Sequence, residues 1–252
     1  MKNKKRRTPR VFIDADLEPD NAELSADRSH YLRSVLRQQK GDTIVVFNGK
    51  GTERSAIIET ISRDRATLRL TDRLTPLVES SLRIVLLQAL VKSDAMDLIV
   101  QKSTELGVHE IVPVETEFSV VKLTEERAAR RVAHWQKIAM SACEQCGRHR
   151  PPVISPPGPL AASLASLDDE SQRIALHVKG SRDLAHSVPV GSETRSIALM
   201  IGPEGGLSEV DLKHAKAAKF DIATLGPRVL RSETAALAAC AILQSGWGDL
   251  SG

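Results

Sequence analysis

Two apolar runs near the end of the chain, each closed by a Gly-Pro loop and followed by a helix-like segment, constrain the fold most. The first run ends in the loop Gly202-Pro-Glu-Gly-Gly206, and the second ends in Gly226-Pro-Arg-Val-Leu230. In α/β proteins, ligands bind at the carboxyl ends of neighbouring parallel strands. The pair therefore predicts one ligand pocket built from both loops.

The composition describes an ordinary globular protein. The 252 residues are 41% apolar and 27% charged, enough for two domains with a sizeable core. No apolar run approaches the roughly 20 residues that cross a bilayer, and the basic start of the chain lacks the apolar stretch of a secretory signal. Three cysteines without a paired framework favour a reducing compartment. We expect a cytoplasmic protein with no membrane contact.

Charge is unevenly distributed along the chain. Residues 1–76 hold 16 Lys and Arg against 11 Asp and Glu, a net of +5, whereas the remainder has a net of −2. A basic first segment suits a module that grips a polyanion, although a soluble, slightly basic protein would look the same. Aromatic residues are only 3% of the chain, which disfavours a stacking platform for single strands. Recognition of RNA through backbone charge and shape fits this composition better.

The first segment predicts a small, mostly antiparallel β domain over residues 1–76. A helix is expected near Ser25–Lys40, with Leu32, Val35 and Leu36 facing inward. The turn Asn48–Gly51 lies between strand-like runs, a strong hairpin signal. The expected strands are Thr43–Phe47, Ser55–Ile61 and Ala66–Leu70, and Thr71–Ser81 is the expected linker.

Residues 77–252 instead alternate strand and helix patterns, which predicts a parallel sheet covered on both faces. The expected strands are Arg83–Leu90, Ile111–Val114, Arg173–Val178, Ile197–Ile201 and Ile222–Leu225. The expected helices include a long one over Thr124–Cys146 and a last one over Ser232–Ser245, and Pro151–Pro159 is an expected break.

The two loops do not carry a phosphate-binding motif. Neither a P-loop pattern nor a three-glycine dinucleotide fingerprint is present, and Glu204 and Glu233 would repel a polyphosphate. A neutral or cationic ligand read through backbone groups fits better. Alternatively, both loops are tight turns, with Ser208 and Ser232 as helix N-caps and Glu209 and Glu233 complementing helix dipoles.

Several ordered motifs together resemble the RsmE family, the small-subunit (16S) rRNA uridine-N3 methyltransferases of the SPOUT superfamily. The resemblance covers almost the whole chain. It rests on Gly202–Leu207, Leu225–Ala235 and Ala142–Arg148, and further on His30–Arg37, Gln101–Gly107 and Trp135–Ile138.

The resemblance implies an α/β fold: a SPOUT-type parallel sheet with a C-terminal trefoil knot, preceded by a small β-rich PUA-like RNA-binding domain. It implies a homodimer, S-adenosylmethionine bound in the knot, and 16S rRNA or the small ribosomal subunit as partner. The implied cofactor-binding residues are Leu176, His177, Ile201, Gly202, Pro203, Glu204, Gly205, Gly206, Leu225, Gly226, Arg228, Val229, Leu230 and Thr234, and the strand Leu176–Val178 is expected to line the site. The basic tail Lys2–Arg7 is an extension without an assigned role.

Methylation at N3 of uracil needs that nitrogen to lose its proton, so a base or a cation must assist. Arg231 is the first candidate to stabilise the uracil anion and Arg228 the second, while Glu204 or Glu233 could take the proton. Either arginine could instead form a structural ion pair with a helix-capping glutamate.

The remaining basic residues give the candidate RNA contacts: Arg28, His30, Arg33 and Arg37 on the first helix, with Lys92, Lys102, Arg148 and Arg150. Any one of them could be a solvated surface residue. Cys143 and Cys146 lie near His149, but a fourth zinc ligand is not evident, so no metal is expected. Two alternatives stay open: a SPOUT methyltransferase acting on another RNA position or atom, and a non-catalytic RNA-binding factor for ribosome assembly.

Overall fold

A computed structural model describes residues 8–77, 79–119, 121, 123–168, 171–187 and 196–250. The chain forms two compact units: residues 1–78 together with 143–151, and residues 79–142 together with 152–252. This division differs from a single cut after residue 76, because a short later segment completes the first unit. The tail Lys2–Arg7, and Val78 within the expected linker, lie outside the described residues.

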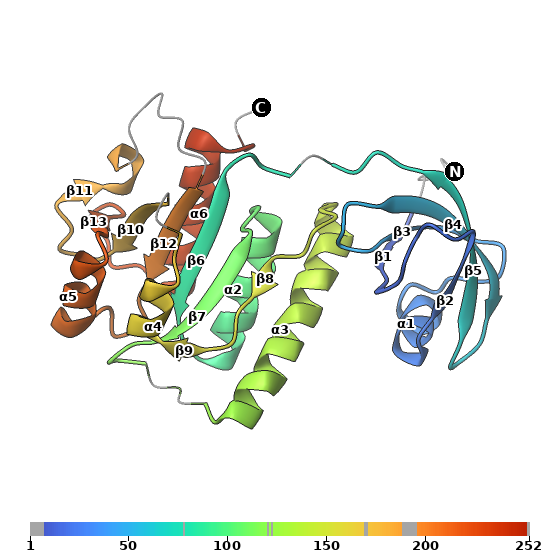
Figure 1. Ribbon diagram of the computed structural model, residues 1–252, viewed down its shortest axis with the longest axis horizontal. Helices are drawn as coiled ribbons and strands as arrows, with labels where there is room; N and C mark the ends of the chain where they lie inside the picture. Colours follow the sequence, from blue (N-terminus) through green and yellow to red (C-terminus); the bar gives the residue numbers. More distant parts are fainter. Residues whose placement is uncertain are drawn as a thin grey trace. The chain divides into compact units, whose positions relative to one another are not determined.

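The first unit is built on a five-stranded sheet in the order β1-β3-β4-β5-β2 (Figure 1). Only β1 and β3 run parallel; the other neighbours are antiparallel, as predicted. Its core is aliphatic and includes Val46, Ile58 and Leu68. The strands are β1 (Arg10–Phe12), β2 (Asn21–Leu24), β3 (Thr43–Phe47), β4 (Glu53–Ile61) and β5 (Ala66–Arg73).

The predicted helix over Ser25–Lys40 is wrong in length. The chain forms α1 (Ala26–His30) and one π-helical turn, η1 (Tyr31–Val35), and Arg37 then adopts a φ of +55° that ends the helical path. The wider turn breaks the 3.6-residue spacing on which the predicted apolar face rested. Leu32 is fully buried as expected, but Val35 is 61% exposed.

The second unit is an α/β layer structure with an all-parallel sheet, as predicted. The strand order is β11-β13-β10-β12-β6-β7-β8, and β9 also pairs with β7. The strands are β6 (Arg83–Ala89), β7 (Glu110–Glu115), β8 (Val153–Ile154), β9 (Gly158–Pro159), β10 (Gln172–Leu176), β11 (Arg182–Asp183), β12 (Ser196–Ile201) and β13 (Asp221–Thr224).

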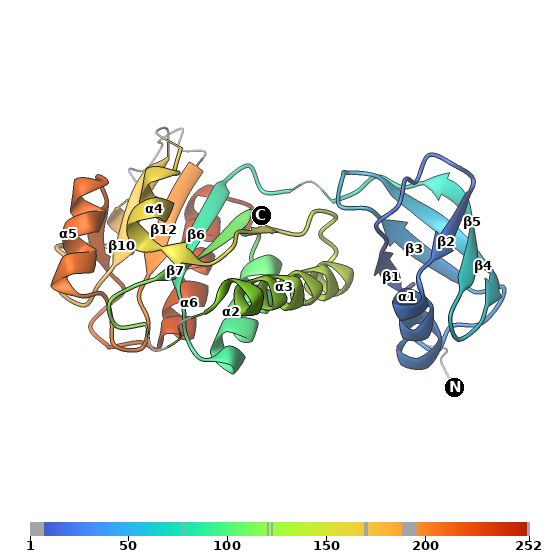
Figure 2. The ribbon, with the colours of Figure 1, turned by 60° about the horizontal axis from the view of Figure 1, so that its bottom comes forward.

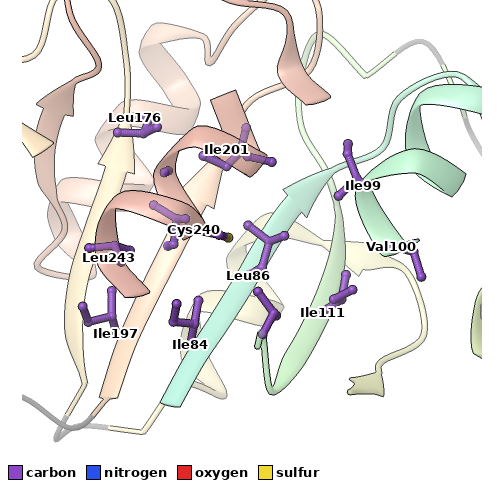
Figure 3. Close-up of a cluster of buried hydrophobic side chains, with 14 of the residues drawn as sticks. Ile84, Leu86, Ile99, Val100, Ile111, Leu176, Ile197, Ile201, Cys240 and Leu243 are labelled. Atoms are coloured by element: carbon purple, nitrogen blue, oxygen red, sulfur yellow. The ribbon is translucent and has the colours of Figure 1, made fainter. Parts of the chain in front are cut away.

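Helices cover both faces of this sheet (Figure 2). Successive side chains of a strand point to opposite faces, so its continuous apolar runs place apolar side chains on both faces. Leu86 contributes to one core with α2, α3 and α6, whereas its neighbours Val85 and Leu87 contribute to the other with α4 and α5. Figure 3 shows the first core, where Cys240 and Leu243 of α6 pack over β6 and β12. The helices are α2 (Ser93–Glu105), α3 (Glu125–Cys146), α4 (Leu160–Ala165), α5 (Glu209–Ala217) and α6 (Ser232–Trp247), with a short 3₁₀ turn, η2 (Leu184–His186).

The helices are not suited to spanning a bilayer: among the described residues, none combines the length and apolar character that a membrane crossing needs.

Candidate active site

A pocket lies at the carboxyl ends of β10, β12 and β13, where both Gly-Pro loops meet. It has about 250 Å³ of free space, near the lower end of ligand pockets, which span roughly 300–1,000 Å³. Its walls are the residues after β10, the loop between β12 and α5, and the loop between β13 and α6. The predicted meeting of the two loops is therefore observed.

The first loop is folded tightly enough to require glycine. A methyl group on Gly202 would stand 3.0 Å from the backbone of Gly206 and Leu207, so a side chain there would collide with the loop itself. Gly206 has a φ of +77° and donates its N–H to the Pro203 carbonyl at 2.9 Å. This turn leaves backbone of the loop lining the pocket.

The two helices that follow the loops begin differently: α5 has a serine N-cap and α6 does not. Ser208 is the N-cap of α5, as the tight-turn alternative held, and it forms a capping box with Asp211. Ser232 is not a cap: Arg231 holds that position in α6 without a side-chain hydrogen bond. The Ser232 hydroxyl instead donates to the Gly202 carbonyl at 2.6 Å and accepts from Gln88 Nε2 at 3.0 Å, so it ties the first loop to the helix after the second.

Most of the predicted cofactor residues line this pocket. They are Leu176, His177, Ile201, Gly202, Pro203, Glu204, Gly205, Gly206, Leu225, Gly226, Arg228, Val229 and Leu230. Thr234 does not line it and is exposed on α6. Val178 also lines it, as expected of the strand Leu176–Val178. Three lining residues were not predicted: Leu207, Ser232 and Ala235. Each of these residues is adjacent in the sequence to a predicted site residue, and this adjacency was the signal that could have found it.

The candidate catalytic side chains lie around the pocket rather than deep in it. Glu204 is exposed on the first loop and lines the pocket. Arg231 is 86% exposed and sits between two lining residues, with its Nη1 4.0 Å from Oε1 of Glu233. At that distance the ion pair is loose, and because the Arg231 side chain is exposed to solvent, the pair does not fix its guanidinium. Arg231 is thus free to reorient toward a substrate.

Most candidate RNA contacts in the first unit are exposed. They are His30, Arg33, Arg37 and Arg150. Arg28 is an exception: its guanidinium donates to the Phe12 carbonyl and pairs with the buried carboxylate of Glu144. Burial and the charge of Glu144 also raise the pKa of Tyr31, which lies under Arg28. Arg28 therefore has a structural partner that the sequence did not suggest.

The other three candidates differ in exposure. Arg148 is half-buried, and its carbonyl accepts from Arg10. In the second unit, Lys92 is exposed, and Lys102 pairs with Glu105 at 2.8 Å. Among the described residues, His, Cys, Asp and Glu side chains form no cluster of three or more that could hold a metal ion.

Comparison with known proteins matches both units. The RNA methyltransferase domain family matches residues 78–244, and the RNA methyltransferase PUA domain family matches residues 24–71. The ribosomal RNA small subunit methyltransferase E of Buchnera aphidicola (subspecies Schizaphis graminum) is 31% identical, with 98% of this chain and 100% of that protein covered. The chain belongs to the RsmE family.

Two solved methyltransferase structures resemble almost the whole chain. A methyltransferase of Legionella pneumophila, in complex with S-adenosylmethionine, is 36% identical, with a TM-score of 0.91 over 97% of this chain and all of that one. The ribosomal RNA small subunit methyltransferase E of Neisseria gonorrhoeae, also bound to S-adenosylmethionine, is 36% identical, with a TM-score of 0.88 over 96% of this chain and 99% of that one.

Proposed function

We propose that this protein transfers a methyl group from S-adenosylmethionine to N3 of a specific uridine in 16S rRNA. The observation that carries the proposal is the pocket formed by the two Gly-Pro loops, in a chain 36% identical to structures that hold this cofactor. Its first unit, matched by the PUA domain family, would contact the RNA.

The pocket suits S-adenosylmethionine chemically. Apolar side chains such as Leu176, Ile201 and Leu225 can enclose the flat adenine, and loop backbone groups can hydrogen-bond its edges. The Glu204 carboxylate offers a counter-charge for a cationic ligand. When bound, the cofactor supplies an electrophilic methyl group on a positively charged sulfur.

Protein groups must then prepare the acceptor. The N3–H proton leaves, N3 forms a bond to the methyl carbon, and the sulfur–methyl bond breaks with its electron pair kept by sulfur. We assign Arg231 to stabilising the negative charge on uracil O2 and O4, with Arg228 as the second cation of the same loop. Glu204 or Glu233 accepts the proton or orients the base.

We further infer a homodimer and a trefoil knot in the second unit, as expected for the family, acting in the cytoplasm without a metal ion. Light scattering on the purified protein tests the dimer, and a monomer mass would contradict it.

The enzyme assignment is tested with labelled S-adenosylmethionine, the purified protein, and either naked 16S rRNA or small ribosomal subunits that lack the modification. We expect label in the rRNA and 3-methyluridine in its nucleoside digest by mass spectrometry. Methyl groups on another atom would favour a different SPOUT specificity. No transfer to either substrate would favour the non-catalytic assembly factor.

The role of Arg231 is tested by Arg231→Ala. We expect loss of methyl transfer with cofactor affinity by calorimetry nearly unchanged, because the guanidinium lies outside the pocket lining. Arg83→Ala is the matched control, since Arg83 is a partly exposed arginine in a surface ion pair with Glu110 at the opposite, amino end of β6. Normal turnover by Arg231→Ala would refute the assignment.

A further inference from the structure

One aromatic side chain is exposed beside the pocket. Phe118, three residues beyond the end of β7, is 49% exposed. The chain has seven aromatic residues, all in the described part, and the other six are buried or half-buried. Exposing a phenyl ring forgoes the stabilisation that its burial would give. The position therefore invites a functional explanation.

The ring lies at the rim formed by the first loop. A methyl group placed on Gly205 would stand 3.1 Å from Phe118 Cβ and 3.6 Å from its Cγ and Cδ2. Gly205 itself lines the pocket. Phe118 thus packs on the backbone of the loop and still presents part of its surface to solvent.

The turn that carries Phe118 is held in place. The Thr116 N–H donates to Ser119 Oγ at 3.1 Å, which closes the turn around the phenylalanine. The Glu117 N–H lies 3.4 Å from Oδ1 of Asp211, the residue whose other oxygen accepts from the Ser208 N–H in the capping box of α5. The turn that carries the aromatic ring is therefore hydrogen-bonded to the start of α5, the helix that follows the first loop.

The acceptor chemistry requires such a surface. N3 lies on the pairing edge of uracil, so the target base must be unpaired and drawn out of its stack before the methyl can reach it. Flipped bases are held by stacking on aromatic or apolar side chains. A single fixed ring at the pocket rim can hold one base, whereas the rarity of aromatics elsewhere gives no platform for a longer strand.

We propose that Phe118 stacks on the flipped target uracil and sets the plane in which N3 approaches the methyl group. The proposal rests on the proposed function, because it names the contact that this site makes with its substrate. Val178 and Val229 line the same pocket and are also exposed, so an apolar surface surrounds the place where the base would enter.

The test compares Phe118→Leu, which keeps an apolar side chain over Gly205, with Phe118→Tyr, which keeps the aromatic face. Stacking contributes enough per base that Phe118→Leu should lower kcat/KM for rRNA roughly 5- to 150-fold. Phe118→Tyr should retain most of the activity. Cofactor affinity by calorimetry should be unchanged in both variants, because Phe118 does not line the cofactor pocket.

Val210→Ala is the matched control. Val210 is 52% exposed at the start of α5 but does not line the pocket, so its loss should leave kcat/KM for rRNA unchanged. Light scattering is run on every variant, because an exposed apolar side chain could instead contact a second copy of the chain.

Each outcome either supports or overturns the proposed stacking. Selective loss of kcat/KM in Phe118→Leu, with normal cofactor affinity and mass, supports stacking. Unchanged kcat/KM overturns it, as does a loss equal to that of Phe118→Tyr or of Val210→Ala. Weakened cofactor binding would make Phe118 a cover for the cofactor, and an altered mass would make it an interface residue. Absence of methyl transfer by the unsubstituted protein would instead refute the proposed function together with this extension.

Discussion

At the level of single residues, the hydroxyl of Ser232 joins parts of the site that are far apart in the chain. It donates to the Gly202 carbonyl and accepts from the Gln88 amide at the end of β6, and all three residues are buried. Buried polar groups that lose such a partner retain their desolvation cost. One small side chain therefore links the first loop to β6 and to the start of the helix that follows the second loop.

Ser232→Ala should destabilise the protein by about 1–3 kcal/mol, because the Gly202 carbonyl would be buried without its partner. It should also weaken S-adenosylmethionine binding, since the first loop would no longer be tied to α6. Urea unfolding and calorimetry measure the two effects. Ser232→Thr keeps the hydroxyl and should behave like the unsubstituted protein; equal losses in both variants would show that side-chain volume matters instead.

Cys240, a fully buried residue of α6, gives a prediction for alkaline pH. Burial raises the pKa of its thiol from 9.0 to about 12. Above pH 9 the unfolded chain loses this proton while the folded chain keeps it, so stability falls as pH rises. Between about pH 8 and pH 10 the Cys240 share of this loss is about 1 kcal/mol. Urea unfolding of Cys240→Ala should show a correspondingly smaller loss over the same interval; an identical loss would contradict the shift.

Local patterns predicted the residues whose roles are local. The glycines of both loops were predicted as pocket residues, because tight turns at strand ends leave few other choices. Ser232 was interpreted as a helix cap, because a serine before an apolar helix is typical of that role. Its actual partners lie 30 and 144 positions away in the chain. No neighbouring residue signals such contacts.

At the level of elements, α3 has two ends with different surroundings. Its last turn, from Cys143, belongs to the first unit. There Oε1 of Glu144 accepts from the Phe12 N–H at 2.9 Å and pairs with Arg28, and the side chain is 5% exposed. At the exposed start of the helix, Glu126 pairs with Arg130 in solvent.

Glu144→Ala should destabilise the first unit by roughly 1–3 kcal/mol, because it leaves the Phe12 N–H without its acceptor and Arg28 without its carboxylate partner. Glu126→Ala, on the same helix, should change stability by no more than about 0.5 kcal/mol, as exposed pairs one turn apart do. Thermal unfolding followed by circular dichroism measures both. Equal effects would mean that the buried pair contributes nothing beyond a surface one.

Elements with a clean period were predictable, and irregular ones were not. The strands β6, β7 and β12 follow continuous apolar runs, which buried parallel strands produce. The two-residue strands β8, β9 and β11 have no such run and were not predicted. The first helix was overestimated because its π-turn and the left-handed Arg37 follow from packing in the first unit rather than from spacing. Val35 consequently faces solvent although it shares helical spacing with Leu32.

At the level of the whole molecule, the first unit is discontinuous in sequence. The chain leaves it after residue 78, returns for residues 143–151 and leaves again. Charge and turn signals indicated only the first of these crossings. The return of the chain at residue 143 has no signal in the composition. The segment joins the first unit through individual contacts, such as those from Glu144 to Phe12 and from the Arg148 carbonyl to Arg10.

A fragment of residues 1–78 should therefore fold poorly by itself. Joining residues 143–151 to it through a flexible linker should restore a cooperative thermal transition and dispersed amide signals in a nitrogen–proton spectrum. The linked fragment with Glu144→Ala is the control, and we expect it to regain less of the cooperative transition. A cooperative transition in the fragment without the added segment would show that the strands of the first unit suffice.

This discontinuity also orders events during synthesis. When the first 78 residues have left the ribosome, the piece that completes their unit has not been translated. At about 5–20 residues per second, roughly 4 to 15 s pass before residue 151 follows. Throughout that interval the nascent β-sheet lacks the Glu144 carboxylate that accepts from the Phe12 N–H, and a protein that methylates ribosomal RNA is itself still attached to a ribosome.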